Sequence, residues 1–524
     1  MIGVNEKIKD SLLGLGLSLL LLLPTLYHVW WHVADTLSFL ATGIVVCAAM
    51  VFVTLCLPWR TGRWLFFSVL YGISLFEIAH LMVYDGDIAS AGYVRSLFMT
   101  TPYEAEGALG RVIKQHVGFI FFLVLAYIVL AAQIFATKPT FKNNRWILLG
   151  AGVLLLIHLL VSPSAILSRP PLNIYAQMTE AWRQRCERNR LTMQESNFAY
   201  HAYREQLSAQ KEVYLLIIDE SLRQDHVSLD GKNYRVTMPR MGELEHLASY
   251  TDYFTTGVFT MYAVPMLVTR ATPTTFALNY TENGIQQAFA EAGFKSIWLS
   301  NEAQLVSDGV SDYVARGAEI IRVKRDVDMP AVVDSLCETA DKLFVILHLW
   351  GNHQFYLNTD EATSLYYPDI TTCEDVHGEQ MYNNAYDNAI LYTDSMLLAL
   401  TEVLQSKTCI AQWIFTSDHG EGPIGRNGGA HGYTTPNSGE YHVPLMVWYS
   451  DEYAAANPDK VENMIHHKEE PVCADHVFWS VLDMAGIRID STLRQDGMSV
   501  FGDTLLPHPR TLLLPNGKSV MSLD

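Results

Sequence analysis

Long runs of apolar residues dominate the first third of the chain. Five of them reach or approach the roughly 20 residues that a helix needs to cross a bilayer. They are Leu12–Trp31, Leu37–Leu57, Trp64–Tyr84, Val117–Phe135 and Trp146–Ser162. The first run has the length of a secretory signal, but four further runs follow it and no small-residue cleavage site is present. The pattern therefore predicts a domain of five transmembrane helices within residues 1–163.

Basic residues near these runs predict how the helices are oriented. They gather before the first run, between the second and third, and between the fourth and fifth: Lys7, Lys9, Arg60, Arg63, Lys138, Lys142 and Arg145. Since loops rich in Lys and Arg stay in the cytoplasm, the chain after residue 162 is expected outside it. Glu77 and His80 lie one turn apart in the third run, where ionisable groups are candidates for function. Their place near the outer end leaves open that they only face interfacial water.

Residues 164–210 form a polar connector with apolar residues at helical spacing. Tyr175, Met178, Trp182 and Cys186 recur every three or four residues. The pattern predicts an amphipathic helix that lies on the bilayer. A soluble helix packed on the following domain fits the same pattern.

From residue 211 to 524, strand-like apolar runs alternate with helical stretches, the pattern of a parallel α/β sheet. The expected strands are Val213–Ile218, Ile297–Leu299, Leu343–Leu349, Trp413–Thr416 and Leu445–Trp448, with long helices at Tyr386–Leu404 and Cys473–Ala485. Four of the strands deliver polar groups at or just after their ends: Asp219-Glu220, Asn301, His348 with His353, and Asp418-His419. In open α/β sheets ligands bind beyond the carboxyl ends of strands, so one shared site is expected.

The charge and the cysteines limit what this site can do. A net charge of −19 argues against non-specific nucleic-acid binding. It also disfavours an anionic substrate unless a metal supplies positive charge locally. The connector and outer domain hold five cysteines, Cys186, Cys337, Cys373, Cys409 and Cys473, which cannot all pair, and their pairing stays open.

Glu220, Asp418 and His419 are ligands of the kind that zinc prefers. A candidate nucleophile is Thr260, which is expected to open a short helix that ends at Val268. Helix N-termini favour anions such as phosphate, and metal coordination would activate the hydroxyl. Taken alone, a Thr at this position is also an ordinary helix cap.

The order and spacing of these motifs resemble the phosphoethanolamine transferases of the Gram-negative inner membrane, in the alkaline phosphatase and sulfatase superfamily. The matching segments are Glu220–Leu229, Thr237–Pro239, Gly257–Pro265, Ser300-Asn301, His348–His353, Ser417–Glu421 and His431-Gly432. The resemblance covers the whole chain. It implies a five-helix transmembrane domain followed by a periplasmic α/β domain of the alkaline phosphatase type.

The resemblance also implies roles for single residues. Glu220, Asp418 and His419 match zinc ligands, and Thr260 matches the nucleophile, which also touches the metal. His353 and His431 match residues that bind the substrate phosphate or a second zinc, and Asn301 and His348 match pocket residues. The implied reaction moves phosphoethanolamine from phosphatidylethanolamine to lipopolysaccharide, on lipid A, Kdo or a core sugar, with one or two zinc ions. We expect a monomer in the inner membrane.

Two departures from the family pattern stand out. Asp219 takes the place of the usual glycine and adds a carboxylate beside the metal, and the cysteine pair that brackets the nucleophile segment in some members is missing. The second departure puts close kinship with the lipid A enzymes of polymyxin resistance in doubt. A metal-dependent phosphodiesterase and a glycerophosphate transferase remain alternatives. A sulfatase is disfavoured because no C/S-x-P-x-R motif lies near Thr260, and a non-enzymatic sensor because every ligand position is retained.

Overall fold

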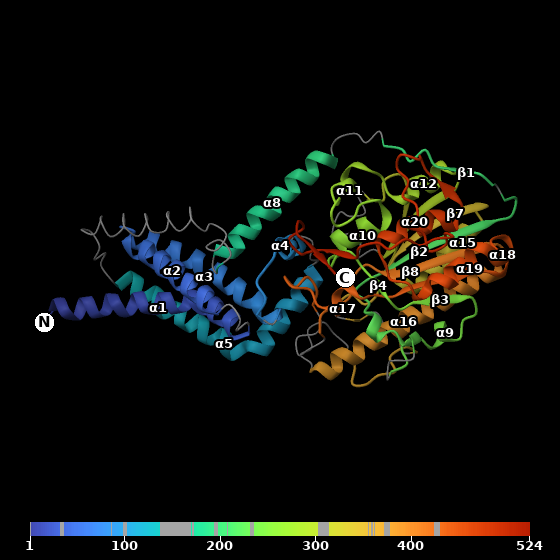
Figure 1. Ribbon diagram of the computed structural model, residues 1–524. Helices are drawn as coiled ribbons and strands as arrows, with labels where there is room; N and C mark the ends of the chain where they lie inside the picture. The colour runs from blue at the N-terminus through green and yellow to red at the C-terminus, as the bar shows by residue number, and fades with distance from the viewer. Residues whose placement is uncertain are drawn as a thin grey trace. The chain divides into compact units, whose positions relative to one another are not determined.

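The computed structural model divides into two compact units, whose elements are labelled in Figure 1. The first unit comprises Met1–Arg95 and Ala105–Arg183, and the second comprises Ser96–Glu104 and Gln184–Asp524. The structure describes residues 2–31, 36–84, 86–97, 102–136, 169, 172–192, 198–206, 208–230, 235–301, 314–354, 356–357, 360, 362–370, 378–423 and 430–524.

Long apolar helices make up most of the first unit. They are α1 (Ile2–Trp31), α2 (Thr36–Cys56), α3 (Arg60–Val83) and α5 (Pro102–Ala136). Among the described residues, four segments have the length and composition to cross a membrane: Leu12–Trp31, Phe39–Cys56, Arg60–Val83 and Val112–Ala136. They confirm the first four predicted spans. The fifth, Trp146–Ser162, lies outside the described residues.

Some polar side chains inside this helical unit form hydrogen bonds, which an apolar surrounding favours. The Tyr71 hydroxyl donates to the Leu123 carbonyl at 3.0 Å, and Ser68 Oγ lies 2.7 Å from the Tyr127 hydroxyl. Glu77 and His80 are both buried, at 1% and 3% exposure. The alternative in which they face interfacial water is therefore wrong.

The predicted connector helix is present as α8 (Leu172–Thr192). Ile174 and Ala181 on it are buried, whereas Tyr175, Met178 and Trp182 are exposed. These three apolar side chains are thus about half exposed or more. Their exposure agrees better with an amphipathic helix on a bilayer than with a helix packed through this face.

The second unit is built on a seven-stranded sheet in the order β3-β9-β8-β2-β7-β5-β6. The strands are β3 (Leu247–Tyr250), β9 (Leu445–Tyr449), β8 (Ile410–Ser417), β2 (Glu212–Asp219), β7 (Lys342–His348), β5 (Lys295–Asn301) and β6 (Glu319–Val323). Strands β8, β2, β7, β5 and β6 are parallel, and β9 pairs antiparallel with both β8 and β3. All five predicted strands are confirmed within a mostly parallel sheet.

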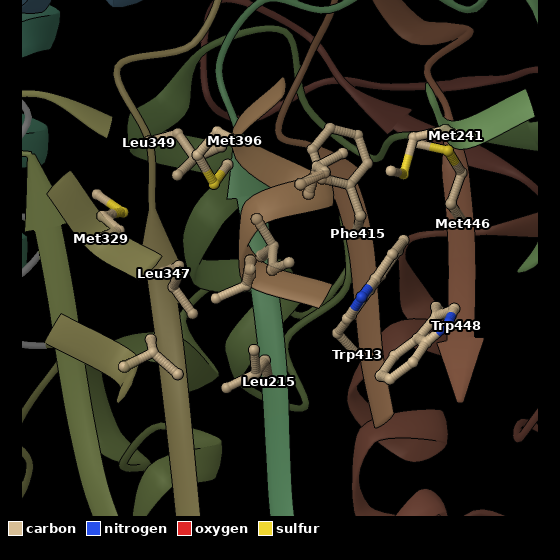
Figure 2. Close-up of a cluster of buried hydrophobic side chains, with 14 of the residues drawn as sticks. Leu215, Met241, Met329, Leu347, Leu349, Met396, Trp413, Phe415, Met446 and Trp448 are labelled. Carbon is tan, nitrogen blue, oxygen red and sulfur yellow. The ribbon is translucent and has the colours of Figure 1, made fainter. Parts of the chain in front are cut away.

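Alternate residues of the central strands face two helical layers, as the strand period of two requires. On one face, side chains from β2, β7, β8 and β9 meet α15 (Met329–Cys337) and α16 (Glu379–Ser406) in one apolar cluster. Figure 2 shows Leu215, Leu347 and Trp413 directed into it. On the other face, Tyr214 of β2 contacts Phe289 of α12 (Ile285–Glu291). Burial on both faces explains why these strands read as continuous apolar runs.

The helix predictions need one correction. Helix α16 contains the predicted Tyr386–Leu404 and begins earlier, at Glu379. The late helix, α20, begins at Asp475 and ends at Met484. Cys473 belongs instead to a short strand, β10 (Val472–Cys473), because that segment pairs with β4 (Tyr253–Phe254).

Candidate active site and metal centre

Neighbouring parallel strands bring the predicted ligands to one edge of the sheet. Asp219 of β2 pairs in register with Ser417 of β8, and the Asp418 N–H donates to the Asp219 carbonyl at 3.0 Å. Glu220 directly follows β2, and Asp418 and His419 directly follow β8, so the three predicted ligands leave the sheet at the same edge. The predicted nucleophile helix is present as α10 (Thr260–Val268), with Thr260 as its first residue.

A hydroxyl, two carboxylates and an imidazole converge at this edge. Thr260 Oγ1 donates to Glu220 Oε2 at 3.0 Å and lies 3.4 Å from His419 Nε2. His419 Nε2 lies 3.2 Å from Glu220 Oε1 and 3.5 Å from Asp418 Oδ2. Ligand atoms of Glu220, Asp418 and His419 all lie within 4.8 Å of one another, and the three side chains are buried. This spacing suits a single small cation with ligands about 2 Å away.

Hydrogen bonds from surrounding groups aim the ligand atoms inward. His419 Nδ1 lies 2.9 Å from the Gly420 carbonyl, a contact that places the ring proton on Nδ1 and leaves the Nε2 lone pair for a cation. The backbone N–H of His419 donates to Asp418 Oδ1 at 2.6 Å, and Ser221 Oγ donates to Glu220 Oε1 at 2.8 Å. Asp418 Oδ2 accepts no hydrogen bond from the described residues. A buried oxygen of this kind is what a metal would satisfy.

The two carboxylates of the cluster also favour the binding of a cation. Burial and the adjacent Glu220 raise the pKa of Asp418 to about 7. Burial acts to lower the pKa of His419, but Asp418 and Glu220 raise it to about 10. Burial acts to raise the pKa of Glu220, yet the charge of His419 lowers it well below its ordinary value. Without metal the carboxylates therefore keep a proton on His419, and a divalent cation would take the place of that proton.

Two further predicted residues lie beside this cluster. The ring of His431 lies 4.1 Å from the ring of His419, and its Nδ1 lies 3.3 Å from Glu421 Oε1. His353 stacks on Trp350 with ring centres 4.0 Å apart, and both His353 and His431 lower the pKa of Glu220. His431 therefore lies next to the predicted ligand cluster, and both imidazoles act electrostatically on Glu220.

The remaining two predicted residues stand in different surroundings. His348 is buried, meets the edge of Trp298 at 6.0 Å, and burial lowers its pKa to about 4. Asn301 Nδ2 donates to Asp326 Oδ1 at 2.9 Å, and Asp326 in turn accepts the N–H groups of Trp350 and Gly351, each at 3.0 Å. Asp326 thus links Asn301 by hydrogen bonds to the backbone just before His353. A role for Asp326 could not be predicted from the sequence, because the residue is neither at the end of a predicted strand nor in a recognised motif.

Gly351 lies so close to Asp219 and to the predicted ligand Glu220 that a side chain would not fit there. Its φ is +51°, and a Cβ there would overlap Asp219 Oδ1 and approach the Glu220 backbone nitrogen to 2.8 Å. We expect Gly351→Ala to displace Glu220 and to destabilise the protein by about 1–3 kcal/mol. Chemical denaturation and zinc titration would measure both effects, with Gly293→Ala as a control, since Gly293 also has a positive φ but open space around it. Equal zinc affinity in the wild type and Gly351→Ala would contradict this expectation.

Asp219, the residue that departs from the family pattern, lies fully buried between Asp326 and Asp418. Burial and the charge of Asp326 raise its pKa well above the ordinary value. Neither carboxyl oxygen has a hydrogen-bond partner among the described residues. The raised pKa favours the neutral form of Asp219, which reduces the negative charge that it adds beside the predicted ligands.

The sequence model of the sulfatases matches residues 212–487, more than half of the chain, and includes every site residue described above. The chain belongs to the sulfatase family. Membership in this family does not by itself identify the substrate.

Relatives and solved structures place the chain within this family. It is 28% identical to YhbX of Escherichia coli K12 over 46% of this chain, an alignment that spans 43% of that protein. It is 22% identical to the phosphoethanolamine transferase EptC of the same strain, over 80% of this chain and 79% of EptC. The structure of the integral membrane lipooligosaccharide phosphoethanolamine transferase A from Neisseria meningitidis covers 94% of this chain and 98% of its own, with 18% identity and a TM-score of 0.64. These findings confirm the resemblance and the combination of apolar helices with a sulfatase-type α/β unit.

Proposed function

We propose that the protein is a zinc-dependent phosphoethanolamine transferase of the bacterial inner membrane, with its α/β unit in the periplasm. The observation that carries the proposal is the position of Thr260, whose hydroxyl lies 3.0 Å from Glu220 and 3.4 Å from His419 at the start of α10. A serine-like hydroxyl held within the metal cluster suits group transfer through a covalent intermediate. The names of the relatives support phosphoethanolamine as the transferred group, and the apolar helices support the location.

In the first step, Thr260 Oγ1 attacks the phosphorus of phosphatidylethanolamine. A new Oγ–P bond forms, the bond between phosphorus and the glycerol oxygen breaks, and diacylglycerol leaves. The threonine proton passes to water; Glu220 orients the hydroxyl through a hydrogen bond, but its pKa lies well below the ordinary value, so it is a poor proton acceptor. The N-terminus of α10 favours the negative charge that stays on the phosphoryl oxygens.

Glu220, Asp418, His419 and the Thr260 hydroxyl would hold the zinc ion. When bound, zinc stabilises charge on the phosphoryl oxygens and lowers the pKa of the threonine hydroxyl. His431 and His353 face the same space and donate hydrogen bonds to the phosphoryl group or a proton to the leaving oxygen. In the second step, a hydroxyl or phosphate of lipopolysaccharide displaces Thr260 from phosphorus and restores the free enzyme.

The test is the intact mass of the full-length protein in detergent after incubation with phosphatidylethanolamine and zinc. We expect wild-type protein to gain the mass of one phosphoethanolamine group and to release diacylglycerol. Peptide mapping should place the added group on Thr260. Phosphatidylglycerol serves as the matched donor control and should leave no adduct.

Each other outcome points to another reaction. Free phosphoethanolamine without an adduct would favour a phosphodiesterase that passes the group to water. An adduct from phosphatidylglycerol alone would favour glycerophosphate transfer. Either result would overturn the proposal.

A further inference from the structure

A second group of metal-binding side chains lies outside the active site. Cys473 ends β10, Asp475 is the first residue of α20, and His508 comes from the segment that precedes β12 (Thr511–Leu513). Ligand atoms of the three residues lie within 4.8 Å of one another, the same limit that the active-site ligands meet. Residues distant in the sequence thus bring a thiol, a carboxylate and an imidazole together.

The polar atoms of this group are incompletely paired although they are buried. Asp475 is 6% exposed and uses Oδ2 to accept from His508 Nε2 at 3.0 Å. Its Oδ1 has no hydrogen-bond partner among the described residues. The same holds for Nε2 of the neighbouring His476, which is 1% exposed. A buried carboxylate oxygen without a partner is costly, and a bound cation would remove that cost.

The thiol of Cys473 is also placed for coordination. It is fully buried, with His476 Nδ1 3.5 Å from its sulfur, and it is in no disulfide. The ring of His508 meets the ring of His476 at 5.5 Å. If Asp475 and His508 formed only an ion pair, Asp475 Oδ1 would stay without a hydrogen-bond partner, and the nearby thiol would have no role. A metal ion accounts for both features.

We propose that Cys473, Asp475 and His508 form a second metal site, which takes zinc or a similar thiophilic divalent cation. A set of one sulfur, one oxygen and one nitrogen ligand is typical of zinc and excludes the hard cations Ca²⁺ and Mg²⁺, which take oxygen ligands. His476 stands beside the sulfur as a further ligand or as the group that orients the thiolate. Cys473 and Asp475 are buried and only His508 reaches the surface, at 20% exposure, so we assign the ion a structural role.

The surroundings of the site explain what such an ion would stabilise. Strand β10 pairs with β4, and the Ala474 N–H donates to the Phe254 carbonyl at 2.9 Å. The chain runs from β4 through Thr255, which donates to the Asp418 carbonyl, to the nucleophile Thr260. Helix α20 packs against α10. An ion here would tie β10, α20 and the C-terminal segment together around the strand that leads to the nucleophile.

Cobalt gives a readout that the active site does not share. A cysteine thiolate bound to Co²⁺ produces a charge-transfer absorption in the near ultraviolet, and the Glu220–Asp418–His419 cluster contains no thiol. We expect full-length protein in detergent, titrated with Co²⁺ after removal of other metals, to develop this absorption. Asp418→Asn should keep it, because the variant damages only the active-site cluster. Cys337→Ser, which removes another buried thiol, should keep it as well.

Two variants address the proposed ligands directly. Cys473→Ser should abolish the absorption. Because Cys473 is fully buried and its replacement can impair folding, His508→Gln provides a second variant at a side chain that is 20% exposed. His508→Gln should weaken Co²⁺ binding at the thiolate by at least about tenfold. No absorption in wild-type protein, its persistence in Cys473→Ser, or unchanged affinity in His508→Gln would each overturn the proposal, whatever reaction the active site catalyses.

Discussion

Thr260→Val is expected to lower the rate of diacylglycerol release from phosphatidylethanolamine by at least about a thousandfold. Losses of this size follow when the nucleophile of a covalent mechanism is removed. Valine keeps the shape and the β-branch of threonine, so α10 should form normally and the loss should fall on kcat. The structure provides the reason: the Thr260 hydroxyl is the one atom of this side chain that contacts Glu220 and His419.

Matched variants separate loss of the nucleophile from damage to the fold. Thr256→Val removes a buried hydroxyl that has no hydrogen-bond partner among the described residues, and it should leave the rate near that of wild type. Thr260→Ser restores a hydroxyl and should recover part of the activity and the covalent adduct. Release of diacylglycerol by Thr260→Val at the wild-type rate would rule out a threonine intermediate.

Removal of metal by a chelator is expected to abolish turnover and to make stability strongly dependent on pH. In metal-free protein the pKa of His419 is raised to about 10 from 6.5, so its contribution to stability is complete below about pH 6.5 and is lost as pH rises through 10. The pKa of Asp418 is raised to about 7 from 3.8, so its contribution is lost as pH rises through 7. Both shifts have the same sign, and the metal-free protein should weaken steadily over this window.

Zinc should reverse this trend, because it displaces the proton that the cluster holds at low pH. The gain in unfolding temperature on adding zinc should therefore be larger at about pH 8 than at about pH 6. At one hundred times the dissociation constant the gain corresponds to about 2.7 kcal/mol. Differential scanning fluorimetry of chelated and zinc-loaded protein would measure it. His508→Gln should keep this pH-dependent gain and Asp418→Asn should lose most of it; an equal gain at both pH values in wild type would contradict the assignment of the ligands.

The strands, the helix that Thr260 begins and four apolar spans could be predicted from the sequence. Strands such as β2 and β8 are buried on both faces, so each appears as an unbroken apolar run that ends in its functional residues. The apolar spans can be recognised from the length of their hydrophobic runs. Both signals can be recognised within a short stretch of sequence. They reflect whether a residue is buried or exposed, and not which distant residue it contacts.

Contacts between residues distant in the sequence could not be predicted and were seen only in the structure. Asn301, whose predicted place in the substrate pocket stays a prediction, donates to Asp326, which in turn accepts the Gly351 N–H. Cys473, expected in a helix, lies in a strand because it pairs with β4, and this pairing brings it to Asp475 and His508. The strand period of two predicts which face of the sheet a residue lies on. Which residues it contacts depends on how the strands pair and how the loops close. For that reason the first metal cluster could be predicted from motifs, whereas the second emerged only from the fold.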